Sequence, residues 1–167
     1  MSVRIRPIEP TDSVVGVTEL LHDAYRQLGE LGLNYTAVDQ DAAATWRRID
    51  RGECLLADVD GDVVGTVTWY APGTLGDGCA WYRRPEVAAF GQFAVRPTAQ
   101  RKGIGSSLIA EVERRARIIG ARELALDTAM PAKHLIEYYV RRGFRRVDTA
   151  QWKGKTYRSV ILSKALI

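Results

Sequence analysis

The chain has 167 residues, of which 46% are apolar and 26% are charged, and its formal net charge is +4. Such a composition is typical of a soluble globular protein, and we expect one domain over residues 1–167. No apolar run reaches the ~18 residues that span a bilayer, which excludes a membrane protein. The arginines are not interleaved with aromatics in one stripe, which argues against a nucleic-acid partner.

The two cysteines, Cys54 and Cys79, are too few for a disulfide framework and lack the spacing of metal ligands. Residues 1–6 alternate apolar with polar or basic side chains and lack the apolar region of a signal peptide. We therefore expect a reduced, cytoplasmic setting and no metal. The mild positive charge is that of a solvated surface, and it would also attract a phosphate-bearing ligand.

The first elements in chain order are a strand and two helices. Residues 3–8 alternate and predict an opening strand. Apolar residues then recur at the helical period from 14 to 28, with Thr11 or Asp12 as the expected N-cap. A second helix is predicted from Asp39 or Asp41 to about residue 49.

A hairpin and a long loop follow these helices. The apolar runs 54–59 and 63–70 flank Asp60-Gly61-Asp62, and Asp-Gly between apolar runs is a strong hairpin signal. Residues 71–86, rich in glycine and proline, predict a long loop of the kind that often carries function. An apolar strand is then predicted over 87–95.

The second half predicts a helix over 106–119, a strand over 123–128 and a helix over 132–142. Two antiparallel strands, 144–147 and 156–162, complete the pattern. Because the strand–helix–strand unit from 87 to 128 needs a right-handed crossover between parallel neighbours, the expected fold is an α/β mixed sheet. It is mostly antiparallel, with one parallel pair and helices on both faces.

The most informative segment is Gln100-Arg101-Lys102-Gly103-Ile104-Gly105, between the strand over 87–95 and the helix that follows. A glycine-rich turn that opens a helix presents backbone N–H groups and the positive end of the helix dipole, so it favours phosphate. The segment has no Gly-Lys-Ser/Thr of a Walker loop. It also lacks the third Gly or Ala of a dinucleotide fingerprint, because Leu108 stands there.

This segment, which follows a strand ending in Val-x-Pro, resembles the acyl-CoA motif of the GNAT superfamily of N-acyltransferases. Tyr139-Val140-Arg141-Arg142-Gly143-Phe144 resembles the Tyr-x-x-x-Gly-Phe that closes the second conserved region of that family. The resemblance is strong over residues 87–146 and rests elsewhere on a compatible layout. It implies a GNAT-like fold and an enzyme that moves an acetyl group from acetyl-CoA, as cosubstrate, to a primary amine of a small molecule or peptide.

For the cofactor, the resemblance implies pyrophosphate binding on the backbone of Arg101 to Ser106, with Ile104 facing the core and Gln100 bracing the loop. It places the pantetheine arm along the main chain of Phe93 and Val95, like an added strand. His134 is a further candidate contact, although an exposed position is the plainer interpretation. The full expected set is Phe93, Ala94, Val95, Gln100, Arg101, Lys102, Gly103, Ile104, Gly105, Ser106 and His134.

Tyr139 matches the family position whose phenol acts as the acid for the departing thiolate; as a structural alternative it is a core aromatic. Many relatives carry a glutamate base on the strand before the loop, but this chain has Gln92, whose neutral amide cannot take a proton. Gln92 stays a candidate catalytic residue that positions a water or the substrate. The remaining candidate bases are Glu86, Asp127 and Asp77, or a water relay. Relatives also often have asparagine where this chain has Ala132.

The acceptor site is expected to come from the first two helices, the long loop and the final hairpin. These parts contain Tyr35, Trp46, Trp69, Trp81, Tyr82 and Trp152, which suit an apolar or flat acceptor, a homodimer interface, or core packing. Two other classes of function stay open: a non-catalytic acyl-CoA-binding sensor, and an interaction domain whose glycines are structural. A longer acyl donor and a hydroxyl acceptor are alternatives within the enzyme interpretation.

Overall fold

The computed structural model describes residues 2–76 and 78–167. Its elements follow in the order β1 (Val3–Pro7), α1 (Val14–Glu30), α2 (Thr36–Asp39), α3 (Ala42–Asp50), β2 (Glu53–Val59), β3 (Asp62–Tyr70), η1 (Trp81–Arg83), β4 (Val87–Val95), η2 (Pro97–Ala99), α4 (Ile104–Ile118), β5 (Glu123–Ala129), α5 (Lys133–Val140), β6 (Arg145–Ala150) and β7 (Ser159–Ala165).

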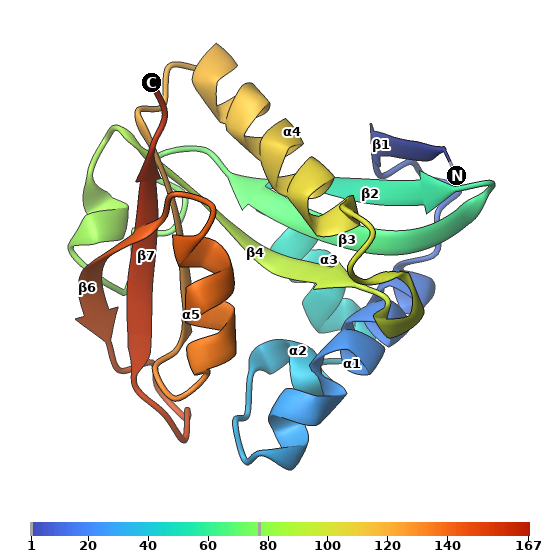
Figure 1. Ribbon diagram of the computed structural model, residues 1–167, viewed down its shortest axis with the longest axis horizontal. Coiled ribbons are helices and arrows are strands. Elements are labelled where there is room, and N and C mark those ends of the chain that lie inside the picture. Colours follow the sequence, from blue (N-terminus) through green and yellow to red (C-terminus); the bar gives the residue numbers. More distant parts are fainter. Residues whose placement is uncertain (1, 77) are drawn as a thin grey trace.

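The strands form one sheet in the order β1-β2-β3-β4-β5-β7-β6. The pair β4–β5 is parallel, and the other neighbouring pairs are antiparallel. Figure 1 shows α4 on one side of strands β2 to β4 and α1 to α3 on the other. The predicted fold class is therefore confirmed, including the single parallel crossover through α4.

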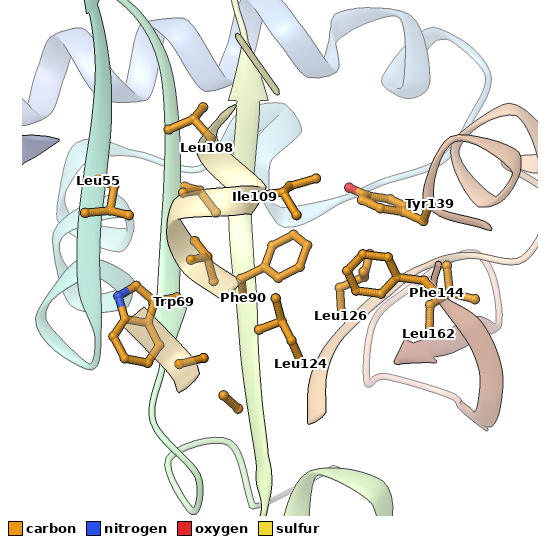
Figure 2. Close-up of a cluster of buried hydrophobic side chains, with 14 of the residues drawn as sticks. Leu55, Trp69, Phe90, Leu108, Ile109, Leu124, Leu126, Tyr139, Phe144 and Leu162 are labelled. Atoms are coloured by element: carbon orange, nitrogen blue, oxygen red, sulfur yellow. The ribbon is translucent and has the colours of Figure 1, made fainter. Parts of the chain in front are cut away.

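Apolar side chains pack between the sheet and the helices on both of its faces. On the face covered by α4 and α5, Leu108 and Val112 of α4 pack with Phe90 of β4 and Tyr139 of α5 (Figure 2). On the opposite face, α1 and α3 pack on β2 and β4 in a smaller cluster that contains Leu21. The sheet is thus fixed from both sides near β4.

Strands β4 and β5 pair only over their first residues, from Val87↔Glu123 to Ala89↔Ala125. Beyond these three pairs the strands separate, and Figure 1 shows β4 running obliquely across the view while β7, the neighbour of β5, stands upright. The edge of β4 from Phe90 to Val95 that would face β5 therefore has no strand partner. This gap within the sheet positions the candidate site.

A β-bulge lies in β4 at Gln92, whose φ is +48°. The pairing with β3 jumps there, from Thr68↔Gly91 to Thr66↔Ala94. Because one extra residue reverses the alternation of side chains, Phe93 packs toward α4 and α5 whereas Gln92 is directed to the face of α1 and α3.

Local departures from the predicted elements have simple causes. Helix α1 is capped by Ser13, which accepts from the Gly16 N–H at 3.0 Å, and not by Thr11 or Asp12. Asp12 is unavailable as a cap because its carboxylate pairs with Arg6 at 2.7 and 2.9 Å. The short α2 was not predicted, and the last two strands lie slightly later than expected. Among the described residues, no helix is long and apolar enough to cross a membrane.

Candidate active site

A cavity of about 970 Å³ opens where β4 and β5 separate, and the start of α4 and one side of α5 also line it. It brings together most of the site residues that the sequence predicts. Those that line it are Gln92, Phe93, Ala94, Val95, Gln100, Arg101, Gly103, Ile104, Gly105, Ser106, Asp127, His134 and Tyr139. Two predicted residues, Glu86 and Lys102, are not among the lining residues.

The loop before α4, the candidate anion site, presents a row of unpaired backbone donors. Within the described residues, the backbone N–H groups from Arg101 to Ser106 have no hydrogen-bond acceptor, whereas the next one, that of Ser107, donates to the Gly103 carbonyl at 3.0 Å. Ile104 is buried, and Gln100 Nε2 donates to the Val95 carbonyl at 3.0 Å, which braces the loop. Six unpaired donors at a helix N-terminus, where the helix dipole is positive, favour a phosphate group.

Two glycines give this loop its shape. Gly103 is the N-cap of α4 with φ +81°, a conformation that side chains with a Cβ disfavour. A Cβ on Gly105 would lie 2.7 Å from the Tyr138 hydroxyl and 3.2 Å from Phe93. Beside the loop, Arg142 Nη2 donates to Ser106 Oγ at 3.0 Å, which holds a cation near the anion site.

The unpaired edge of β4 has neighbours from other elements. The Phe93 carbonyl accepts from the Tyr25 hydroxyl of α1 at 2.9 Å, and the Val95 carbonyl accepts from Gln100. These are the two residues whose main chain is expected to bind the pantetheine arm. Each carbonyl oxygen has a second lone pair, so a further donor can share it.

Tyr139 on α5 belongs to an aromatic cluster with Phe90, Phe93, Tyr138 and Phe144, with ring centroids 5.2 to 6.4 Å apart. Figure 2 shows its hydroxyl directed from α5 toward β4. Burial raises the pKa of this phenol well above its usual value. The group therefore stays protonated at neutral pH and can act as a donor toward the cavity, so packing and an acid role are compatible.

Gln92, at the position where many relatives carry glutamate, is buried and engaged in hydrogen bonds. Its Oε1 accepts from Gln40 Nε2 at 2.6 Å, and its Nε2 donates to Thr68 Oγ1 at 3.4 Å. Gln40 also donates to Thr45 and accepts from Arg48 Nη1 at 2.8 Å. The amide thus joins β4 to α3 through a buried polar network.

Asp127 lies near the end of β5 and is exposed to the cavity. Its Oδ1 accepts from the Tyr82 hydroxyl at 2.7 Å and its Oδ2 from the Trp152 indole at 3.0 Å. Desolvation by the surrounding protein raises the pKa of this carboxyl, against the lowering effect of the two hydrogen bonds. A carboxylate with a raised pKa that faces a cavity has the properties of a general base.

The other candidate bases differ in position. Glu86 precedes β4, and its carboxylate lies 3.8 Å from Arg84 outside the cavity. Asp77 lies outside the described residues. Of the two candidate carboxylates within the described residues, Asp127 is therefore the one beside the gap between β4 and β5.

Several cavity residues were missed by sequence reasoning, because they come from elements far apart in the chain. They are Tyr25, Arg48, Lys155, Tyr157 and Arg142. Arg48 gave no signal in the sequence, because only the structure shows that its neighbours Thr45 and Ile49 on α3 are buried. Of the aromatics expected at the acceptor site, Tyr35 and Trp152 line the cavity.

Comparisons with known proteins identify the family of this chain. The sequence model of the acetyltransferase (GNAT) family matches residues 15–144. S-(2-succino)cysteine N-acetyltransferase of Bacillus subtilis (strain 168) is 29% identical over 153 residues, which cover 89% of this chain and 87% of that protein. The chain belongs to the GNAT acetyltransferase family, and it is an acyltransferase.

Solved structures show the same fold. A GNAT family acetyltransferase from Elizabethkingia anophelis with acetyl-CoA bound superposes with a TM-score of 0.70 at 19% identity, covering 98% of each chain. The PaiA N-acetyltransferase of Thermoplasma acidophilum in complex with coenzyme A gives a TM-score of 0.74 at 17% identity, covering 99% of each chain. Acetyl-CoA is the acyl donor of the family, as the sequence motif implied.

Proposed function

We propose that this protein transfers the acetyl group of acetyl-CoA directly to a primary amine. The observation that carries the proposal is the convergence of three groups on one cavity: the unpaired N–H groups of residues 101–106, the Asp127 carboxylate and the Tyr139 hydroxyl. The name of the Bacillus subtilis relative also describes acetylation of an amine, that of S-(2-succino)cysteine.

The candidate cofactor residues suit the pyrophosphate and the pantetheine arm of coenzyme A. Residues 101–106 offer the pyrophosphate their free N–H groups, with Arg101 and Arg142 beside them. The edge of β4 beyond Ala89 offers the amide groups of the pantetheine arm the main-chain partners that β5 does not supply. An arm laid along this edge from Val95 brings the thioester near Gly91 to Phe93, between β4 and Asp127.

Each residue then has a separate task. Asp127 accepts a proton from the amine, which must lose one before its nitrogen can attack the acetyl carbon. A backbone N–H of β4 near the bulge donates to the oxyanion that forms. As the C–S bond breaks, Tyr139 gives its proton to the departing thiolate. The nitrogen carries a second surplus proton after its attack and gives it to the Tyr139 phenolate, while Asp127 keeps the first. One C–N bond forms and one C–S bond breaks; of the two protons that the ammonium loses, one ends on Asp127 and one restores the phenol of Tyr139.

The proposal is tested by calorimetric titration with acetyl-CoA, desulfo-CoA and ATP, followed by measurement of thiol release over a panel of amines. Binding of acetyl-CoA but not of ATP, with amine-dependent thiol release, is expected. Without acetyl-CoA binding the anion-site assignment is wrong. If acetyl-CoA binds but no amine in the panel accelerates thiol release, the transfer step is contradicted.

Replacing Tyr139 with phenylalanine is expected to lower kcat by about 100-fold, because general acids typically contribute 10²–10⁴-fold. The ring keeps its place in the aromatic cluster, so the affinity for acetyl-CoA and the melting temperature should stay close to those of the unmodified protein. Steady-state kinetics and calorimetry on the same sample measure both. An unchanged kcat would mean that Tyr139 only packs.

A further inference from the structure

Besides Arg101 and Arg142 near the candidate anion site, the cavity contains a second pair of cations, Arg48 and Lys155. Arg48 of α3 lies beside Gly91 at the centre of β4: its Nη2 is the nearest atom, at 3.5 Å, to the place that a Cβ on Gly91 would take. Because β4 rises about 3.3 Å per residue, Gly91 is about 13 Å along the strand from Val95, where the phosphate loop begins. Arg48 therefore lies at the end of the cavity proposed for the thioester and not at the end proposed for the phosphates.

Neutral groups hold the Arg48 side chain. Its Nη1 donates to Gln40 Oε1 at 2.8 Å, within the network that contains Gln92. Among residues 2–76 and 78–167, no carboxylate lies within ion-pair distance of this guanidinium. Its position is thus fixed while its charge is not neutralised by a contact.

Lys155, in the connection between β6 and β7, is the second cation. Its Nζ donates to the Asn34 carbonyl at 2.7 Å and to Thr36 Oγ1 at 3.0 Å, both neutral acceptors. Desolvation and the positive charge of Arg48 lower the pKa of this amine, while Asp39 and Asp127 raise it without forming an ion pair in the described part of the chain. Two like charges thus face one cavity, so an anion between them would be attracted to both.

The charges around this part of the cavity do not balance. Arg48 and Lys155 contribute two positive charges, the exposed Lys153 also lines the cavity, and Asp127 contributes one negative charge. Asp127 accepts hydrogen bonds from the neutral side chains of Tyr82 and Trp152. A ligand that is positive at one end and negative at the other matches this distribution.

We propose that the acceptor is an amino acid or an amino-acid derivative, whose carboxylate binds Arg48 and Lys155 while its amine lies at Asp127. The inference rests on the proposed N-acetyltransferase function and specifies the substrate class of the same site. The planar guanidinium of Arg48 suits a carboxylate, because its N–H groups match the two carboxylate oxygens. The side chain of the acceptor would extend toward Tyr35 and Trp152 on the cavity wall.

The test compares amines in matched pairs, each an amino acid and the amine that lacks its α-carboxylate. Suitable pairs are methionine with 3-(methylthio)propylamine, phenylalanine with phenethylamine, and S-carboxymethylcysteine with S-carboxymethylcysteamine. In accepted pairs, kcat/KM for the carboxylated member should be about 30-fold higher or more, as expected for a charge-assisted hydrogen bond. The difference should lie mainly in KM, because the carboxylate is bound in the ground state and the transition state alike.

Two variants and a matched control assign the preference to residues. Arg48→Met and Lys155→Met should each reduce the ratio within a pair by raising KM for the carboxylated member, with little effect on the other member. Arg47→Met removes the same charge from the neighbouring position of α3, where the side chain is exposed and outside the cavity, and should leave the ratio unchanged. Equal losses for both members of a pair would contradict the proposal.

A binding measurement covers the case in which no pair is turned over. Succinate is titrated calorimetrically into the protein loaded with coenzyme A, and binding that Arg48→Met abolishes and Arg47→Met retains supports the proposal. Succinate binding that is absent, or independent of Arg48, overturns it. The acetyl-CoA titration on the same samples reports separately on the proposed function: retained acetyl-CoA binding without a carboxylate preference overturns the acceptor class alone.

Discussion

Replacing Gly103 with valine is expected to weaken acetyl-CoA binding by about 100-fold or more. Gly103 has φ +81°, which valine adopts only with strain, so the loop must change shape or hold that strain. Either change displaces the free N–H groups of residues 101–106, and each charge-assisted hydrogen bond lost costs about 1.5–3 kcal/mol. Calorimetric titration with acetyl-CoA measures the effect.

The same helix offers a matched control. Gly120, just beyond the C-terminal end of α4, has φ +86°, and like Gly103 it has open space where a Cβ would lie. Gly120→Val should therefore cost a similar 1–2 kcal/mol of stability, roughly the penalty for a left-handed side-chain-bearing residue. It should leave acetyl-CoA affinity intact. If both variants bind acetyl-CoA normally, the loop is structural and the phosphate assignment fails.

Asp127→Asn is expected to lower kcat by about 10²- to 10⁴-fold, the contribution typical of a positioned general base. The amide keeps the size of the side chain and its place beside Tyr82 and Trp152, but it cannot take a proton. Glu86→Gln, which changes the other described candidate in the same way outside the cavity, should have little effect. If kcat fell more in Glu86→Gln than in Asp127→Asn, Glu86 would be the base.

The pH dependence gives an independent readout of Asp127. A base must be ionised to act, so kcat/KM should fall as the pH drops through the pKa of this carboxyl. Because desolvation raises that pKa, the acid limb should lie at higher pH than for an exposed aspartate, whose pKa is near 3.9. The pH–rate profile of Asp127→Asn should lack this limb.

The sequence was a good guide to the fold where local signals were strong. The Asp60-Gly61 turn predicted the β2–β3 hairpin. The apolar period of α4 predicted a helical crossover, which implied the parallel pair of β4 and β5. The N-cap of α1 was wrongly assigned because the competitor for Asp12 is Arg6, a residue of the preceding strand. A cap depends on which polar neighbours are free, and that is decided by tertiary contacts.

The row of unpaired backbone donors before α4 was predictable because these donors are consecutive in the chain. The cations of the acceptor side were not, since Arg48 and Lys155 come from elements that meet only after folding. Asp127 was one of several candidate bases, and only the structure places it at the cavity. The sequence showed that Gln92 cannot act as a base, but not that it lies in a bulge at φ +48° or bonds to Gln40, 52 positions earlier. Such contacts leave no periodic signal.

Because β4 and β5 separate, acetyl-CoA bound between them would connect the two parts of the sheet. The two parts of the sheet share only the pairs from Val87 to Ala89, and a ligand lying in the gap would act as a strand that joins them. At a concentration of 100 times its Kd, such a ligand adds about 2.7 kcal/mol to the free energy of unfolding. Acetyl-CoA should thus raise the melting temperature by roughly 5–10 °C and slow amide hydrogen exchange along β4 and β5. The concentration of acetyl-CoA would then affect the stability of the protein against unfolding as well as the rate of the reaction.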